Sequence, residues 1–149
     1  MASNPSLVLK RRLKAAPEKV YQAWTQPQQM IHWWGVRPTT KKTPIAETDV
    51  RVGGHFRVQF WADSGEHHSV SGTYREVVPN RRLVFTWTWQ STPERESQVT
   101  LDFKPVEQDT LLTLMHENFI NEKVRDDHGI GWGQSLDALE RALAEHIPA

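Results

Sequence analysis

This sequence of 149 residues contains no cysteine and carries no net charge. The lack of cysteine excludes disulfides, a thiol nucleophile and thiolate metal sites. Eighteen basic and eighteen acidic residues cancel, which argues against nucleic acid or an anionic membrane as main partner, because phosphate binding needs a positive excess. No apolar run approaches the roughly 18–20 residues of a membrane span, and no secretory signal opens the chain. We therefore expect a soluble protein of the cytoplasm.

Tryptophan, in contrast, is abundant, with seven residues in this short chain. Because its large ring is unfavourable in water, Trp usually lines a core, a pocket or an interface. A chain of this length most simply forms one domain, here residues 1–149. The first question is therefore what the tryptophans surround.

The first third of the chain predicts one strand followed by two short helices. Residues 6–14 alternate between apolar and polar side chains, which is typical of a half-buried strand. Pro17 and Pro27 stand at the favourable first positions of two helices, and Gly35 ends the second helix. After a polar loop, a short strand is expected over 44–50.

The end of the chain predicts a long amphipathic helix that starts near Trp132. Its apolar residues recur at spacings of four, three and four, at Trp132, Leu136, Leu139 and Leu143. This single apolar stripe must cover an apolar surface, which the central strands would supply. The charged residues before it, 121–130, either add helical turns or form a lead-in, and the sequence leaves both open.

The apolar pattern of the central strands selects one register, because a shift by one residue would turn every side chain to the other face. Asp63-Ser64-Gly65 resembles a three-residue hairpin loop with a left-handed glycine. This loop predicts that Phe60 pairs with His68, Val58 with Val70, and Phe56 with Gly72. The missing side chain at Gly72 indicates a bend or open space beside the strand.

A four-residue turn at 79–82 predicts that Val78 pairs with Leu83. The apolar pattern then favours pairs of Trp89 with Val99 and of Phe103 with Leu112. In this register most of the large apolar side chains share one face of the sheet. Three polar residues join them on that inner face: Tyr74, Glu76 and His116. The neighbours His67 and His68 cannot chelate one metal ion, because adjacent strand residues point to opposite faces.

These elements follow one another as in a known family. The motifs that carry the resemblance are Pro17–Thr25, His32-Trp33-Trp34-Gly35, Val52-Gly53-Gly54-His55-Phe56, 72–79, 82–87, 110–116, and Gly131-Trp132 with Leu136 and Leu139. Over nearly the whole chain the sequence resembles the family of activator of Hsp90 ATPase homologues, C-terminal-domain type. That family is part of the START/birch-pollen-allergen-like (SRPBCC) superfamily. The chain departs from the pattern at Asn118, where a glycine usually precedes the aromatic residue.

The resemblance implies an α+β helix-grip fold, in which a curved antiparallel sheet wraps on a long C-terminal helix and two short helices lie near the N-terminus. Such a fold often encloses a cavity for an apolar molecule. We expect it to bind a small apolar, aromatic or lipid-like ligand with no cofactor and no metal. The residues expected to line the cavity are Phe56, Val58, Phe60, Tyr74, Phe85, Trp87, Leu101, Leu114, His116, Trp132 and Leu136.

Two other functions stay open. The family name implies a chaperone contact and a role in stress response. Trp24, Trp33 and Trp34 either plug the mouth of the grip, or Trp33 or Trp34 forms an exposed contact surface. This function ranks second, because the separate N-terminal domain of the eukaryotic activators has no counterpart here. Alternatively, Glu76 and His116 act as general acid and base in a cyclase or hydrolase. The inner aromatics either line a cavity or fill it, and a homodimer is also compatible with the sequence.

Overall fold

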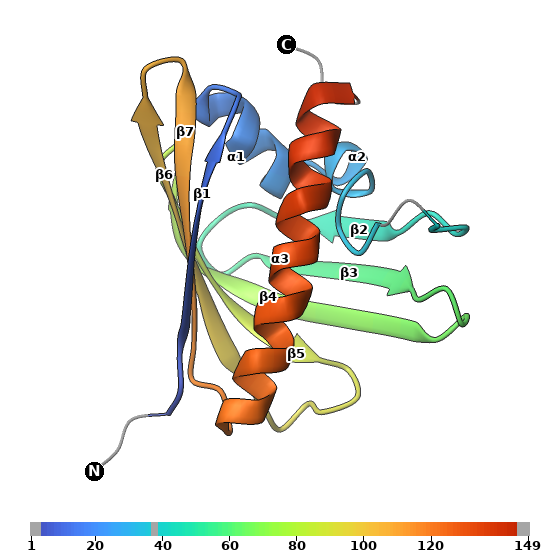
Figure 1. Cartoon of the computed structure of the whole chain (residues 1–149). Helices are drawn as coiled ribbons and strands as arrows, with labels where there is room; N and C mark the ends of the chain where they lie inside the picture. Colours follow the sequence, from blue (N-terminus) through green and yellow to red (C-terminus); the bar gives the residue numbers. More distant parts are fainter. Residues whose placement is uncertain (1–3, 37–38, 146–149) are drawn as a thin grey trace.

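The computed structural model of the chain describes residues 4–36 and 39–145. Seven strands form one antiparallel sheet in the order β1-β7-β6-β5-β4-β3-β2. The strands are β1 (Leu7–Leu13), β2 (Ile45–Thr48), β3 (His55–Trp61), β4 (His67–Val78), β5 (Arg82–Trp89), β6 (Ser97–Val106) and β7 (Asp109–Glu117). The helices are α1 (Pro17–Thr25), α2 (Pro27–Met30) and α3 (Glu122–Glu145). The sheet curves around α3, and α1 and α2 lie at one end of it (Figure 1), which is the helix-grip arrangement.

The N-terminal elements lie where the sequence predicts them. Pro17 and Pro27 occupy the first turns of α1 and α2. The second helix is shorter than expected, because α2 ends at Met30 and the chain continues in turns to Gly35. Gly35 has a φ of +66°, and a side chain there would overlap the ring of Phe60. Glycine therefore both ends this segment and lets it approach β3 closely.

The helix α3 begins well before Trp132 and takes in most of the charged segment that the sequence left undecided. Asn121 caps its N-terminus, since the Asn121 Oδ1 accepts a hydrogen bond from the Val124 backbone N–H at 2.9 Å. Its buried residues include the predicted Trp132, Leu136 and Leu139. The added N-terminal turns are important for the site, because they form one wall of the cavity described below.

The predicted register is confirmed for two of the hairpins. Phe56 pairs with Gly72, Val58 with Val70 and Phe60 with His68, and Phe103 pairs with Leu112. Gly65 has a φ of +91° in the loop between β3 and β4. The Ala62 N–H donates to the Glu66 carbonyl oxygen at 2.9 Å and closes this loop.

The predicted pairing of β4 with β5 is wrong by one residue at the turn. Val78 pairs with Arg82 rather than with Leu83, because Asn80 adopts a φ of +65° and allows a shorter turn. A β-bulge between Tyr74 and Glu76 then shifts the register back, so Tyr74 lies on the inner face as predicted. In the observed register Glu76 lies on the outer face of the sheet and not on the predicted inner face. There Glu76 Oε2 lies 3.1 Å from Arg82 Nε.

The predicted pair of Trp89 with Val99 is also wrong. Val99 pairs with Phe85, and Trp87 pairs with Ser97. The error is an even number of residues, so the inner side chains stay on their face. Residues 90–96 leave the sheet and connect the end of β5 with the start of β6.

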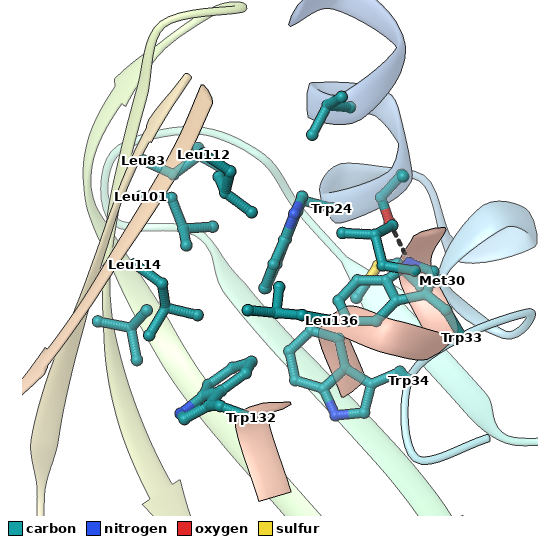
Figure 2. Close-up of a cluster of buried hydrophobic side chains, with 14 of the residues drawn as sticks. Trp24, Met30, Trp33, Trp34, Leu83, Leu101, Leu112, Leu114, Trp132 and Leu136 are labelled. Carbon is teal, nitrogen blue, oxygen red and sulfur yellow. Dashed lines mark hydrogen bonds between the residues drawn. The ribbon is translucent and has the colours of Figure 1, made fainter. Parts of the chain in front are cut away.

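The core lies between the sheet and the helices. Figure 2 shows Trp24 between leucines of the sheet and the aromatic side chains of Trp33 and Trp34. The side chains of Trp24 and Trp33 are 2% and 0% exposed, so this part of the grip is closed to water. None of the described helices combines the length and the apolar character needed to cross a membrane.

Gly72 marks a close approach of two strands and not the open space that the sequence indicated. A Cβ atom at Gly72 would overlap the backbone carbonyl oxygen of Thr86 and lie 2.6 Å from Cε1 of Phe56. The backbone cannot move away easily, because both strands are inside the sheet.

We predict that Gly72→Ala lowers the free energy of unfolding by about 1–3 kcal/mol, as expected for overpacking. Urea unfolding followed by circular dichroism measures this change. The control is Gly133→Ala in α3, where a Cβ meets nothing within 4 Å and should raise stability by about 0.5–1 kcal/mol. An unchanged stability of the Gly72 variant would contradict the close approach.

Candidate functional site

A cavity of about 490 Å³ lies beside the N-terminal half of α3. It is bounded by the ends of β3, β4 and β5, by the 90–96 connection and by residues 118–120. Its wall is mainly aromatic and includes Trp34, Phe60, Trp87, Trp89, Phe119 and Trp132. At the rim Trp61 packs under Lys42, whose Nζ lies 4.0 Å from the ring centroid.

The structure divides the predicted pocket residues into two groups. Phe60, Trp87 and Trp132 line the cavity, and their role in binding a ligand stays a prediction. The others lie outside this wall and in the packed interior, namely Phe56, Val58, Tyr74, Phe85, Leu101, Leu114, His116 and Leu136. Burial also raises the pKa of Tyr74. The space that these residues were expected to surround is occupied by other side chains.

That space is filled by tryptophans from α1 and from the turn after α2. The Trp24 and Trp33 ring centroids are 4.6 Å apart, and those of Trp24 and Trp132 are 5.9 Å apart. Trp34 stacks on Trp87 with an interplanar angle of 19°. Trp33 and Trp34 are only 0% and 5% exposed. With Trp24 they form a buried cluster between the sheet and the helices, which we call the plug. They therefore do not form the exposed surface that the chaperone hypothesis required.

His116 sits behind the cavity wall in a chain of hydrogen bonds. The Trp132 Nε1–H donates to His116 Nδ1 at 3.0 Å. Because Nδ1 accepts this bond, a neutral His116 carries its proton on Nε2 and donates it to Ser97 Oγ, 2.7 Å away. The Ser97 hydroxyl in turn donates to the Trp87 carbonyl oxygen at 3.2 Å. The chain of bonds therefore fixes the indole of Trp132 and connects it, through His116 and Ser97, to the backbone of Trp87.

His116 donates to Ser97 in this hydrogen bond, whereas in a catalytic pair the serine nucleophile donates to the histidine base. A base would need a free lone pair on Nε2 to accept the Ser97 proton, yet Nε2 carries the proton here. Burial, together with the nearby His128, lowers the pKa of His116 to about 2. Glu76 lies on the outer face with Arg82. The hypothesis of a Glu76–His116 acid–base pair is therefore wrong for this fold.

A second tryptophan–histidine pair lies beside the first, with the His116 and His128 ring centroids 5.2 Å apart. The Trp89 Nε1–H donates to His128 Nε2 at 2.9 Å, and His128 Nδ1 donates to the Val124 carbonyl oxygen at 2.8 Å. Burial lowers the pKa of His128. The Phe119 ring lies against both imidazoles, with centroids 4.3 Å from His116 and 4.9 Å from His128. Both nitrogens of each imidazole are thus engaged.

Sequence reasoning missed His128 and Phe119 as wall residues, and it placed Trp89 on the inner face without counting it among the pocket residues. One signal was present for His128, which precedes Trp132 by one helical repeat and so shares its face once the helix is extended. Within the described part of the chain, no three metal-binding side chains of His, Asp or Glu converge.

The buried imidazole of His116 predicts a specific loss of stability in acid. Its folded-state pKa lies below the ordinary value, so below about pH 6.5 the unfolded chain takes up a proton that the folded chain does not. Stability therefore falls as the pH falls, by about 1.4 kcal/mol per pH unit from this one group. The window runs from about pH 6 down to about pH 3.

His116→Gln removes the titrating group, while its amide can still accept from Trp132 and donate to Ser97. We predict that the difference in unfolding free energy between wild type and variant shrinks as the pH falls through this window. Urea unfolding at matched pH values measures it. Parallel pH profiles for the two proteins would contradict the buried neutral imidazole.

Comparison with solved structures shows that other proteins share this fold. Protein CV1439 from Chromobacterium violaceum is 26% identical, with a TM-score of 0.76 over 91% of this chain and 94% of that one. CalU16 from Micromonospora echinospora is 27% identical, with a TM-score of 0.70 over 94% of this chain and 76% of that one. Protein NE0264 from Nitrosomonas europaea is 22% identical, with a TM-score of 0.77 over 97% of each chain.

No curated protein shows a significant match to the sequence. A family match, described as Activator of Hsp90 ATPase homolog 1-like protein, covers residues 14–144. This match spans most of the chain, including Trp24 of α1, Trp33 and Trp34 after α2, and the wall residues of α3. The chain belongs to the family of Activator of Hsp90 ATPase homolog 1-like proteins.

Proposed function

We propose that this protein binds a small, mostly apolar molecule in the cavity beside the N-terminal half of α3. The observation that carries the proposal is the cavity of about 490 Å³ with its aromatic wall. Its volume lies within the range of roughly 300–1,000 Å³ that is typical of small-molecule sites. Flat rings such as Trp89 and Phe119 favour a ligand with an aromatic or lipid-like body.

The polar groups in the wall and directly behind it support binding rather than turnover. His116, His128 and Ser97 already use their hydrogen-bonding atoms on one another or on the protein. Their effect is to hold Trp89 and Trp132 in fixed orientations. Shape would therefore select the ligand, and the protein would act as a carrier or sensor of that molecule.

The family name alone favours a chaperone contact, which we rank below ligand binding. The two tryptophans that would have formed an exposed contact surface, Trp33 and Trp34, are buried in the plug. The cavity, by comparison, has exposed residues on its wall, among them Gly131 of α3.

Two helical glycines provide a matched test of the proposal. A Cβ atom at Gly131 or at Gly133 would meet nothing within 4 Å. Only Gly131 lies on the cavity wall. We predict that Gly131→Phe weakens binding of 2-naphthamide and decanamide by at least about tenfold, because its ring occupies space that the ligand needs. Gly133→Phe should bind both probes like the wild type.

Isothermal titration calorimetry measures the affinities, and circular dichroism checks that both variants fold. Both are expected to fold, because replacing a helical glycine raises helix propensity. Wild-type protein that binds neither the aromatic nor the aliphatic probe would overturn the proposed function. Equal loss of binding in both variants would place the site elsewhere.

A further inference from the structure

The charged residues around the cavity are not equally engaged. Besides the histidines His68 and His128, three described residues of the wall are acidic or basic, namely Asp63, Arg95 and Asp127. The Thr39 hydroxyl donates to Asp63 Oδ2 at 2.6 Å. The Lys123 ammonium donates to Asp127 Oδ2 at 2.9 Å, one helical turn away. Both carboxylates therefore already have a close partner.

Arg95 is held much more loosely. Its Nε lies 4.0 Å from Glu94 Oε1, and the two side chains are 46% and 68% exposed. An ion pair of this kind in solvent contributes little, about 0–1 kcal/mol. It also leaves most of the five N–H donors of the guanidinium for another acceptor.

The backbone holds Arg95 at the cavity. The Arg95 N–H donates to the Thr92 carbonyl oxygen at 3.0 Å, and the Thr92 N–H donates to the Trp89 carbonyl oxygen at 3.1 Å. These two turns connect Arg95 directly to the end of β5, where Trp89 forms part of the aromatic wall. A cation and an aromatic surface thus share one short connection.

We propose that Arg95 makes the cavity selective for organic acids. The apolar body of the ligand packs on the aromatic wall, and its carboxylate accepts hydrogen bonds from the guanidinium. Arg suits this task because its planar fork matches the two oxygens of a carboxylate. The inference rests on the proposed function and specifies the chemical class of its ligand: an aromatic or aliphatic carboxylic acid.

Two probes of equal shape test this selectivity, 2-naphthoate and the neutral 2-naphthamide. We expect wild-type protein to bind the carboxylate at least about tenfold more tightly at low salt, with a smaller ratio at high salt because ions screen an exposed pair. Arg95→Gln should abolish this preference and leave the affinity for 2-naphthamide unchanged. Calorimetric titration of both probes against each protein gives the ratio.

The control is Arg81→Gln, which removes the same charge from the turn between β4 and β5, away from the cavity wall. It should keep the wild-type preference. Equal binding of the two probes by the wild type, or the same loss of preference in both variants, would overturn the role of Arg95. Binding of 2-naphthamide in those cases would leave the proposed function intact. Failure of both naphthalene probes and of decanamide would instead remove the proposed function itself.

Discussion

Mutual packing of five tryptophans determines where the interior of this protein is solid and where it is hollow. They are Trp24, Trp33, Trp34, Trp87 and Trp132. The buried indole N–H groups of Trp24 and Trp87 have no hydrogen-bond partner among the described residues. An unpaired buried donor costs about 1–3 kcal/mol, so close packing of large rings must offset that cost. The cavity begins where this packed cluster ends.

Two tryptophan–histidine hydrogen bonds hold the wall of the cavity in a fixed arrangement. Trp132 donates to His116, and Trp89 donates to His128, so each indole is held by an imidazole from another element. Burial keeps both imidazoles neutral by lowering their pKa values, and a neutral imidazole is the form that can accept these bonds. The same burial that builds the wall removes the imidazoles from acid–base chemistry at neutral pH.

The fold could be predicted from the sequence because alternation in strands and periodicity in helices still identify the buried face when a strand pairing is wrong by an even number of residues. The register of β3 with β4 was correct because the hairpin loop at Gly65 has strict chemistry. The prediction of the β4–β5 turn was wrong because the left-handed backbone of Asn80 shortens the turn. Glu76 was placed on the wrong face because alternation along β4 does not reveal the bulge between Tyr74 and Glu76. The site was predicted less well, because periodicity tells which face a side chain is on but not which neighbour fills the space. Trp24, Trp33 and Trp34 fill it here.

The indole N–H resonances of the seven tryptophans report on this division of the interior most directly. Titration of 2-naphthamide into ¹⁵N-labelled protein, followed by two-dimensional NMR, locates the ligand among them. If the ligand binds in the cavity, we predict shifts for Trp89 and Trp132 on the wall and little change for Trp24 and Trp33 in the plug. The largest shifts at Trp24 and Trp33 would show that a ligand enters the packed cluster, and would contradict the account.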